Sequence, residues 1–232
     1  MTTLILLAAG RGTRLGILTE EIPKCLNNFR GRTLLEHIFE RAREVSVGFD
    51  EIIIVGGYKW EHLLQFGHTV LINSDWSTTG PFGTLETADS HLSKKNCVVS
   101  YTDIFFSTNF LESCLESDQD IFIPSNKSFL ESWGGRQIEI LSDLESFKVE
   151  SEMVTEIGMR VERIEEVQGQ FAGLLRLTPA GWTSLKECAT EQVRKKSDIT
   201  WMLQKAIENN VKLGTKQVLG FWKEFDEVSD FA

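Results

Sequence analysis

Short apolar runs alternate with helical patterns in the first half of the chain. The apolar runs are continuous, as in strands that are buried on both faces, and they span residues 2–8, 51–55, 69–72, 97–101 and 120–123. Hydrophobic residues recur every three or four positions, as in helices, over residues 33–45, 84–92 and 107–116. This alternation is typical of a mostly parallel sheet covered by helices on both faces. We therefore predict a doubly wound α/β fold, in which ligands bind at the carboxyl ends of the strands.

The pattern changes between about residues 125 and 169. The segments there are shorter and more polar, and include IEILSDLESFKV and TEIGMRVERIEE, which predicts a small inserted antiparallel lobe. Helical spacing returns over Ile199–Asn209, a helix that Asp198 is placed to cap. Because no repeat or linker divides the sequence, we expect one domain, residues 1–232, with this lobe inside it.

Composition and charge exclude several classes of protein. The net charge of −10 argues against a nucleic-acid surface, which requires clustered lysine and arginine. The apolar run Leu4–Ala9 is only six residues long and follows no basic segment, so we interpret it as a strand and expect a cytoplasmic protein without membrane contact. The four cysteines show no CxxC spacing, and we expect reduced thiols.

The loop after the first strand has the composition of a phosphate-binding loop. The segment LAAGRGTRLG contains three glycines and two arginines in ten residues, and glycines allow backbone amides to approach phosphate oxygens closely. A dinucleotide fingerprint would need a glycine where Leu15 stands, and the Gly-Lys-Ser/Thr of a P-loop is absent. The loop therefore belongs to neither of these two types.

The longer segment LAAGRGTRLGILTEEIPKCL resembles the signature of the sugar-phosphate nucleotidyltransferase superfamily. Many relatives have a proline where Gly16-Ile17 stands here. The resemblance implies a Rossmann-like nucleotidyltransferase fold in which the first loop contacts the base, ribose and triphosphate, and Lys24 lies beside the α-phosphate. In this loop the implied nucleotide-binding residues are Leu7, Ala8, Ala9, Gly10, Gly12, Thr13 and Arg14.

A second loop bears on the choice of nucleotide. The segment NSDWSTTGPFGTLETA resembles the base-recognition loop of cytidylyltransferases, and Gly80 and Thr84 are the matching positions. The resemblance therefore favours CTP, although a polar loop before a helix also explains these residues. UTP, GTP or dTTP, used with a sugar 1-phosphate, is the alternative.

Four further segments resemble the phosphocholine and aminoethylphosphonate cytidylyltransferase branch. They are VVSYTDIFF, WGGRQIEILSDLESF, GQFAGLLRLTPAGW and FWKEFDEVSDF. In that branch, carboxylates after the strand that here ends at Tyr101 and in a C-terminal Trp-x-Glu-x-Asp-like motif hold Mg²⁺, which implies Asp103 and Asp226 as metal ligands. The implied catalytic set is Arg14, Lys24, Asp103 and Asp226.

The same resemblance implies an acceptor pocket. Its residues would be Trp133, Arg136, Asp143 and Glu145. Arg136 suits a phosphate or phosphonate, the acidic pair suits a cationic tail, and Trp133 suits a quaternary ammonium through a cation–π contact. Ordinary packing of the tryptophan and a solvated strand face for the two acids are the alternatives.

The implied reaction transfers CMP from CTP to a small phosphate- or phosphonate-bearing acceptor and releases pyrophosphate. Two alternatives stay open: a sugar-1-phosphate nucleotidyltransferase, and a non-catalytic nucleotide-binding regulatory protein. The resemblance also suggests surface polysaccharide biosynthesis as the setting and is compatible with a homodimer.

Overall fold

One mixed sheet forms the centre of the protein. The computed structural model describes residues 2–129 and 144–231. In this part of the chain, ten strands form the sheet in the order β5-β4-β1-β6-β12-β8-β13-β10-β9, with β11 paired to β8. The strands are β1 (Thr2–Ala8), β4 (Glu51–Gly56), β5 (Thr69–Ile72), β6 (Asn96–Tyr101), β8 (Ile121–Asn126), β9 (Glu145–Glu150), β10 (Met153–Arg160), β11 (Gln170–Phe171), β12 (Leu174–Leu177) and β13 (Gly214–Val218).

The N-terminal half of the sheet is parallel, as predicted. Strand β1 lies between β4 and β6, and both neighbours run parallel to it. Strand β12 runs antiparallel to β6 and β8, whereas β13 is again parallel to β8. Because all three strands β4, β1 and β6 point the same way, the loops that follow them meet at one edge of the sheet.

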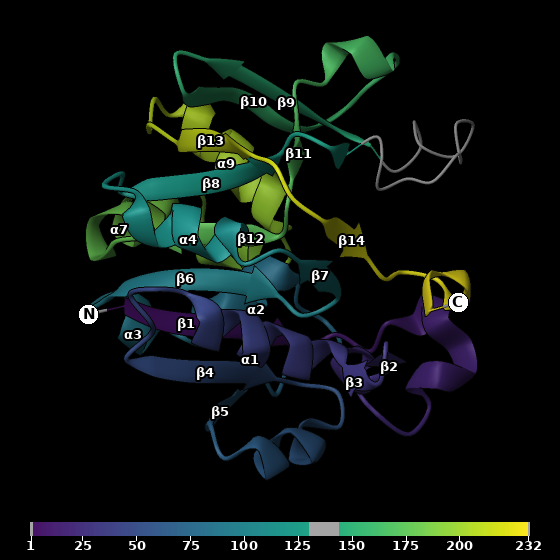
Figure 1. Ribbon diagram of the computed structural model, residues 1–232. Coiled ribbons are helices and arrows are strands. Elements are labelled where there is room, and N and C mark those ends of the chain that lie inside the picture. Colours follow the sequence, from purple (N-terminus) through teal and green to yellow (C-terminus); the bar gives the residue numbers. More distant parts are fainter. Residues whose placement is uncertain (1, 130–143, 232) are drawn as a thin grey trace.

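Helices cover both faces of the sheet (Figure 1). Leu4 and Leu6 of β1 pack in one core with helices α1 (Leu34–Glu44) and α4 (Asn109–Glu116). Ile5 and Leu7 point the other way, because side chains alternate along a strand. Their core includes residues of α2 (Pro81–Glu86), α3 (Asp89–Leu92), α7 (Pro179–Glu187) and α9 (Ile199–Glu208), and the chain also forms a short α8 (Glu191–Arg194). The doubly wound α/β prediction is confirmed.

Two local predictions about helices are wrong. The sequence predicted one helix over residues 84–92. The structure has two short helices instead: α2 begins at Pro81, and α3 begins at Asp89. Asp198 stands at the N-cap position of α9, but its side chain makes no capping hydrogen bond. Asp198 instead lines a cavity described below.

The antiparallel part predicted after residue 125 is present. Strands β9 and β10 pair antiparallel, and β10 joins the main sheet through β13. A 3-10 helix, η4 (Ile164–Glu166), follows β10. The extent of a separate lobe stays a prediction, since residues 130–143 lie outside the described part.

Two small antiparallel ribbons flank the sheet. One joins β2 (Asn28–Phe29) to β3 (Arg32–Thr33), and the other joins β7 (Ile104–Phe106) to β14 (Trp222–Glu224). Three 3-10 helices, η1 (Thr13–Thr19), η2 (Lys24–Leu26) and η3 (Trp60–Phe66), follow the early strands, and η5 (Val228–Phe231) lies near the end of the described chain. η5 lies beside η1 (Figure 1), which places the end of the described chain next to the first loop.

No helix among the described residues has the length and apolar character needed to cross a membrane.

Candidate active site

Two adjoining cavities lie at the carboxyl ends of β1 and β6. The smaller has a volume of about 330 Å³ and is lined by the first loop together with Lys24, Asp103, Glu224 and Asp226. The larger has a volume of about 1060 Å³ and extends toward β9, β10 and α9. Arg14, Tyr101, Glu224 and Asp226 line both cavities. A ligand in one cavity therefore lies next to a ligand in the other.

The first loop contributes backbone to the smaller cavity. Gly12 adopts the left-handed conformation (φ 69°) that favours glycine, and its carbonyl accepts hydrogen bonds from the Leu15 amide and the Thr19 hydroxyl. The lining includes the predicted residues Leu7, Ala8, Gly10, Gly12, Thr13 and Arg14. The predicted residue Ala9 is absent from it, and the Ala9 carbonyl accepts a hydrogen bond from the Tyr58 amide. The role of these residues in binding the nucleotide stays a prediction.

Lys24 is held between two aspartates that lie far away in the sequence. Its Nζ lies 2.7 Å from Asp103 Oδ2 and 2.7 Å from Asp226 Oδ1. Burial acts to lower the pKa of this ammonium group, but the two carboxylates outweigh burial and raise the pKa above its usual 10.5. Arg14 adds a second cation 3.2 Å from Asp226.

The ribbon β7–β14 assembles the carboxylates. Asp103 immediately precedes β7, and Glu224 ends β14, where it pairs with Ile104. One ligand atom from each of Asp103, Glu224 and Asp226 lies within 4.8 Å of the others. Burial, followed by the charges of Asp103 and Asp226, raises the pKa of Glu224 to about 8. The three acids therefore form one cluster in which negative charge is costly.

The cluster fits a divalent metal ion. Asp103 Oδ1 is buried and makes no hydrogen bond within the described part of the chain, although its partner oxygen binds Lys24. Buried carboxylate oxygens are normally paired or bound to a metal. Oxygen ligands from one or two carboxylates also suit Mg²⁺, which takes its other ligands from phosphates and water.

Glu224 was missed in the sequence analysis. The signal for it was available, because the segment FWKEFDEVSDF contains both acids two positions apart. Residues two apart on a strand point to the same face. Glu224 ends β14, Asp226 lies two residues beyond it, and both line the smaller cavity.

Gly80 and Thr84 do not line either cavity. The Gly80 amide donates to the Lys195 carbonyl, and a Cβ on Gly80 would lie 2.5 Å from the Ser197 carbonyl oxygen. Thr84 is buried, and its hydroxyl accepts a hydrogen bond from the Asn73 side chain. The Gly80 contacts join the start of α2 to the segment before α9, and the Thr84 contact joins α2 to the residue after β5. The predicted role of the two residues in base recognition stays a prediction.

The larger cavity contains one residue of the predicted acceptor pocket. Glu145 lines it, and its Oε1 accepts a hydrogen bond of 3.4 Å from the Thr200 hydroxyl. Burial raises the pKa of Glu145, and the charge of Asp198 adds to this effect. Arg160 stands opposite Glu145 in the register of β10 and β9, and it also lines the cavity. Trp133, Arg136 and Asp143 lie outside the described residues, and the sequence analysis missed Arg160, Asp198 and Thr200.

We expect Gly12→Ala to lower turnover at least about tenfold, because small displacements of a catalytic group are costly. A Cβ on Gly12 would lie 2.9 Å from Lys24 Cδ, so the lysine would have to move. Gly67→Ala is the matched control, since Gly67 also has a positive φ (70°) but nothing within 4 Å of the added Cβ. Both variants should lose about 1–2 kcal/mol of stability, measured by denaturant unfolding, and equal turnover in both would contradict this account.

The fold and the site together define a class of protein that binds and transfers nucleotides. Residues 4–154 match the family model of the MobA-like NTP transferase domain, and the chain belongs to this family. It is a nucleotidyltransferase, as the first loop predicted.

Relatives match the chain over nearly its whole length. The CTP:phosphoglutamine cytidylyltransferase of Campylobacter jejuni is 26% identical over 97% of this chain and 96% of its own. The inositol-1-phosphate CTP transferase structure from T. maritima has a TM-score of 0.77, 19% identity and coverage of 99% of this chain and 91% of that chain. The CTP:phosphocholine cytidylyltransferase structure from Streptococcus pneumoniae has a TM-score of 0.69, 19% identity and coverage of 99% and 96%.

Proposed function

We propose that this nucleotidyltransferase is a cytidylyltransferase that transfers CMP from CTP to a small phosphate- or phosphonate-bearing acceptor and releases pyrophosphate. The observation that carries this proposal is the position of Lys24 between Asp103 and Asp226, at the wall of the smaller cavity. A cation and two acids at this point can neutralise a triphosphate and hold the metal that accompanies it. The Campylobacter jejuni relative, named as a CTP-dependent enzyme, supports CTP as the nucleotide.

The proposed chemistry needs no general base. An anionic oxygen of the acceptor attacks the α-phosphorus of CTP, and the new P–O bond forms as the bond to the pyrophosphate oxygen breaks. The leaving pyrophosphate takes the electron pair of that bond. Catalysis then depends on positioning and on neutralising charge, the roles that we assign to Arg14 and Lys24.

Asp103 and Asp226 would hold Mg²⁺, with Glu224 in the same cluster. When bound, this ion would act as a Lewis acid that neutralises phosphate charge. Lys24 contacts both aspartates and Arg14 contacts Asp226, so in our proposal these two cations already lie beside the place where the triphosphate binds. A charged group that is already held near the reacting phosphate needs little reorganisation in the transition state.

The larger cavity suits the acceptor. Its wall combines the cation of Arg160 with the acids Glu145 and Asp198, and it meets the smaller cavity at Arg14 and Asp226. This mixed charge favours an acceptor that carries an amino group as well as its phosphate. We keep Trp133, Arg136 and Asp143 as proposed acceptor residues on the strength of the sequence resemblance alone.

The test is pyrophosphate release with CTP and Mg²⁺ against a panel of acceptors. The panel contains phosphocholine, phosphoethanolamine, aminoethylphosphonate, an amino-acid phosphate, phosphoglutamine and glycerol phosphate. We expect turnover with an acceptor that bears an amino group. Activity only with UTP, GTP or dTTP and a sugar 1-phosphate would replace the proposal with that alternative. Nucleotide binding without any turnover would favour the alternative of a non-catalytic regulatory protein.

Four broader points stay predictions: one domain over residues 1–232 with an acceptor lobe at about 125–169, a cytoplasmic location, a homodimer, and a role in surface polysaccharide biosynthesis. Size-exclusion chromatography with light scattering would decide the oligomeric state.

A further inference from the structure

A cluster of aromatic rings lies behind the carboxylates. Phe29, Phe105 and Phe225 pack edge to face, with ring centroids 5.4 Å apart for Phe29 and Phe105 and 4.7 Å apart for Phe29 and Phe225. Phe225 is fully buried and Phe29 nearly so. Edge-to-face packing of this kind fixes the relative orientation of the rings.

Each ring comes from a segment that carries a residue of the site. Phe225 lies between Glu224 and Asp226, and its amide donates a 2.9 Å hydrogen bond to the Asp103 carbonyl. Phe105 follows Asp103 by two residues, and Phe29 follows the 3-10 helix that contains Lys24. A shift of one ring would therefore move a carboxylate or the lysine.

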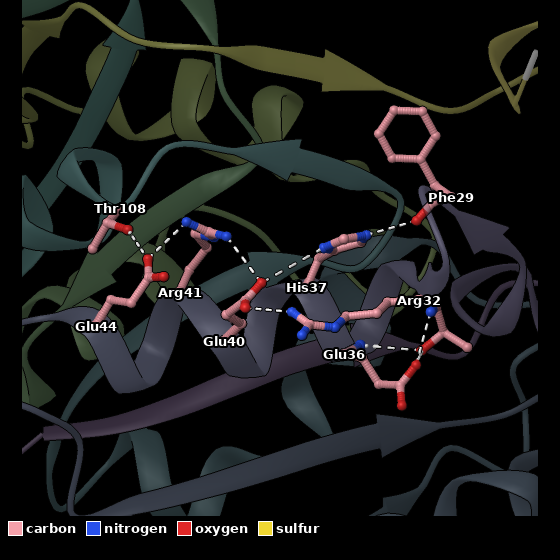
Figure 2. Close-up of polar contacts among 9 residues, drawn as sticks. Phe29, Arg32, Glu36, His37, Glu40, Arg41, Glu44 and Thr108 are labelled. Atoms are coloured by element: carbon pink, nitrogen blue, oxygen red, sulfur yellow. Dashed lines mark hydrogen bonds and ion pairs between the residues drawn. The ribbon is translucent and has the colours of Figure 1, made fainter.

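His37 of α1 packs on this aromatic cluster, and its imidazole points toward the Phe29 carbonyl (Figure 2). Its Nε2 lies 2.8 Å from the Phe29 carbonyl oxygen, and since a carbonyl only accepts, Nε2 carries the proton and donates. The imidazole is buried and packs edge to face on Phe105, with centroids 4.8 Å apart. Helix α1 thus binds the ribbon β2–β3 by a side-chain hydrogen bond and the ribbon β7–β14 by ring packing.

A polar network fixes α1 itself. Glu40 pairs with Arg32 of β3 and with Arg41, and its Oε2 lies 3.9 Å from His37 Nδ1. One turn further on, Glu44 accepts hydrogen bonds from Arg41 (2.7 Å) and from the Thr108 hydroxyl (2.6 Å). Figure 2 shows these contacts as a row along the helix. The row connects the β2–β3 ribbon to the segment after β7.

We propose that His37 is a positioning residue for the carboxylate site. Its hydrogen bond holds Phe29, and Phe29 in turn holds Phe225 and with it the spacing of Asp103 and Asp226. This inference rests on the proposed function of the carboxylates as metal ligands. Residues that hydrogen-bond metal ligands typically change metal affinity about 10- to 100-fold, and we expect the lower end of this range for His37, which acts through Phe29 and Phe225.

The experiment compares His37→Gln with His37→Asn. The amide nitrogen of glutamine reaches about as far as Nε2, whereas that of asparagine ends near Nδ1 and cannot reach the Phe29 carbonyl. The quantities to compare are the Mn²⁺ affinity without nucleotide, from electron paramagnetic resonance, and kcat and KM for CTP. His37→Asn should weaken Mn²⁺ binding about tenfold and lower kcat similarly, with KM for CTP changing less. His37→Gln should retain affinity within about twofold of wild type.

Phe39→Leu is the control for lost stability. Phe39 is buried in the same helix but packs against Phe66 and His68, away from the aromatic cluster. The Phe39→Leu variant should have a lower Tm than wild type and the same Mn²⁺ affinity. Wild-type Mn²⁺ affinity in His37→Asn, or equal losses in the two His37 variants, would overturn the inference.

The outcomes also separate this inference from the proposed function. A wild-type protein that binds no Mn²⁺ would remove the metal site and the inference with it. Mn²⁺ binding that depends on His37 in a protein that transfers no CMP would support the positioning role and contradict only the proposed reaction.

Discussion

Asp103→Asn is expected to lower turnover by roughly a thousandfold. The substitution keeps the shape of the side chain but removes its charge. Asp103 Oδ2 accepts from Lys24 at 2.7 Å, and Oδ1 is buried without a hydrogen-bond partner among the described residues, so both oxygens have roles that an uncharged amide cannot fill. Pyrophosphate release at saturating CTP and Mg²⁺ measures the loss.

Asp118→Asn is the matched control, because Asp118 is exposed and lines neither cavity. It should retain wild-type turnover. Asp103→Asn should also weaken Mn²⁺ binding in the absence of nucleotide, which separates loss of the metal from loss of a later step. Wild-type turnover in Asp103→Asn would contradict the assignment of this residue to the metal site.

The parallel core could be predicted because its residues follow a simple rule. Strands β1, β4 and β6 are buried on both faces, so they appear in the sequence as continuous apolar runs. The exact ends are less regular, and β6 begins at Asn96 rather than at residue 97. Periodicity reports burial, whereas strand ends depend on the ladder of backbone hydrogen bonds.

Periodicity alone did not predict the ribbon β7–β14. Lys24 and Asp226 are 202 residues apart, and the pairing of Ile104–Phe106 with Trp222–Glu224 places the segment of Asp226 next to that of Asp103. No local pattern encodes such a pairing, and the resemblance to a known family supplied the two aspartates without it. The two aspartates were therefore predicted as ligands, but their ion pairs with the lysine were not.

Local propensity misled the analysis at Asp198. An aspartate before a helix is a strong N-cap signal, yet Asp198 lines the larger cavity and its side chain makes no capping hydrogen bond. Sites of function are where such local rules are expected to fail. This failure is one reason to place Asp198 in the proposed acceptor cavity.

Lys24→Ala is expected to lower turnover by about 10²- to 10³-fold. Lys24 is the more deeply buried of the two cations beside the aspartates, with a side-chain exposure of 12% against 65% for Arg14. A buried cation stabilises developing phosphate charge more strongly than an exposed one, since water screens it less. The variant should keep its fold, because Lys24 does not belong to the apolar cores, but it should be less stable than wild type because the acidic cluster loses its buried cation.

The same variant should bind Mn²⁺ more tightly when nucleotide is absent, by at least about tenfold. The wild-type ammonium lies 2.7 Å from both aspartates and therefore competes with a second cation for them. Lys95→Ala is the matched control, since Lys95 pairs with Glu51 on the surface and should change neither turnover nor Mn²⁺ affinity. Lower turnover with tighter Mn²⁺ binding would show that Lys24 acts on the phosphates, not as a support for the metal. Weaker Mn²⁺ binding would assign the lysine to holding the carboxylates in place.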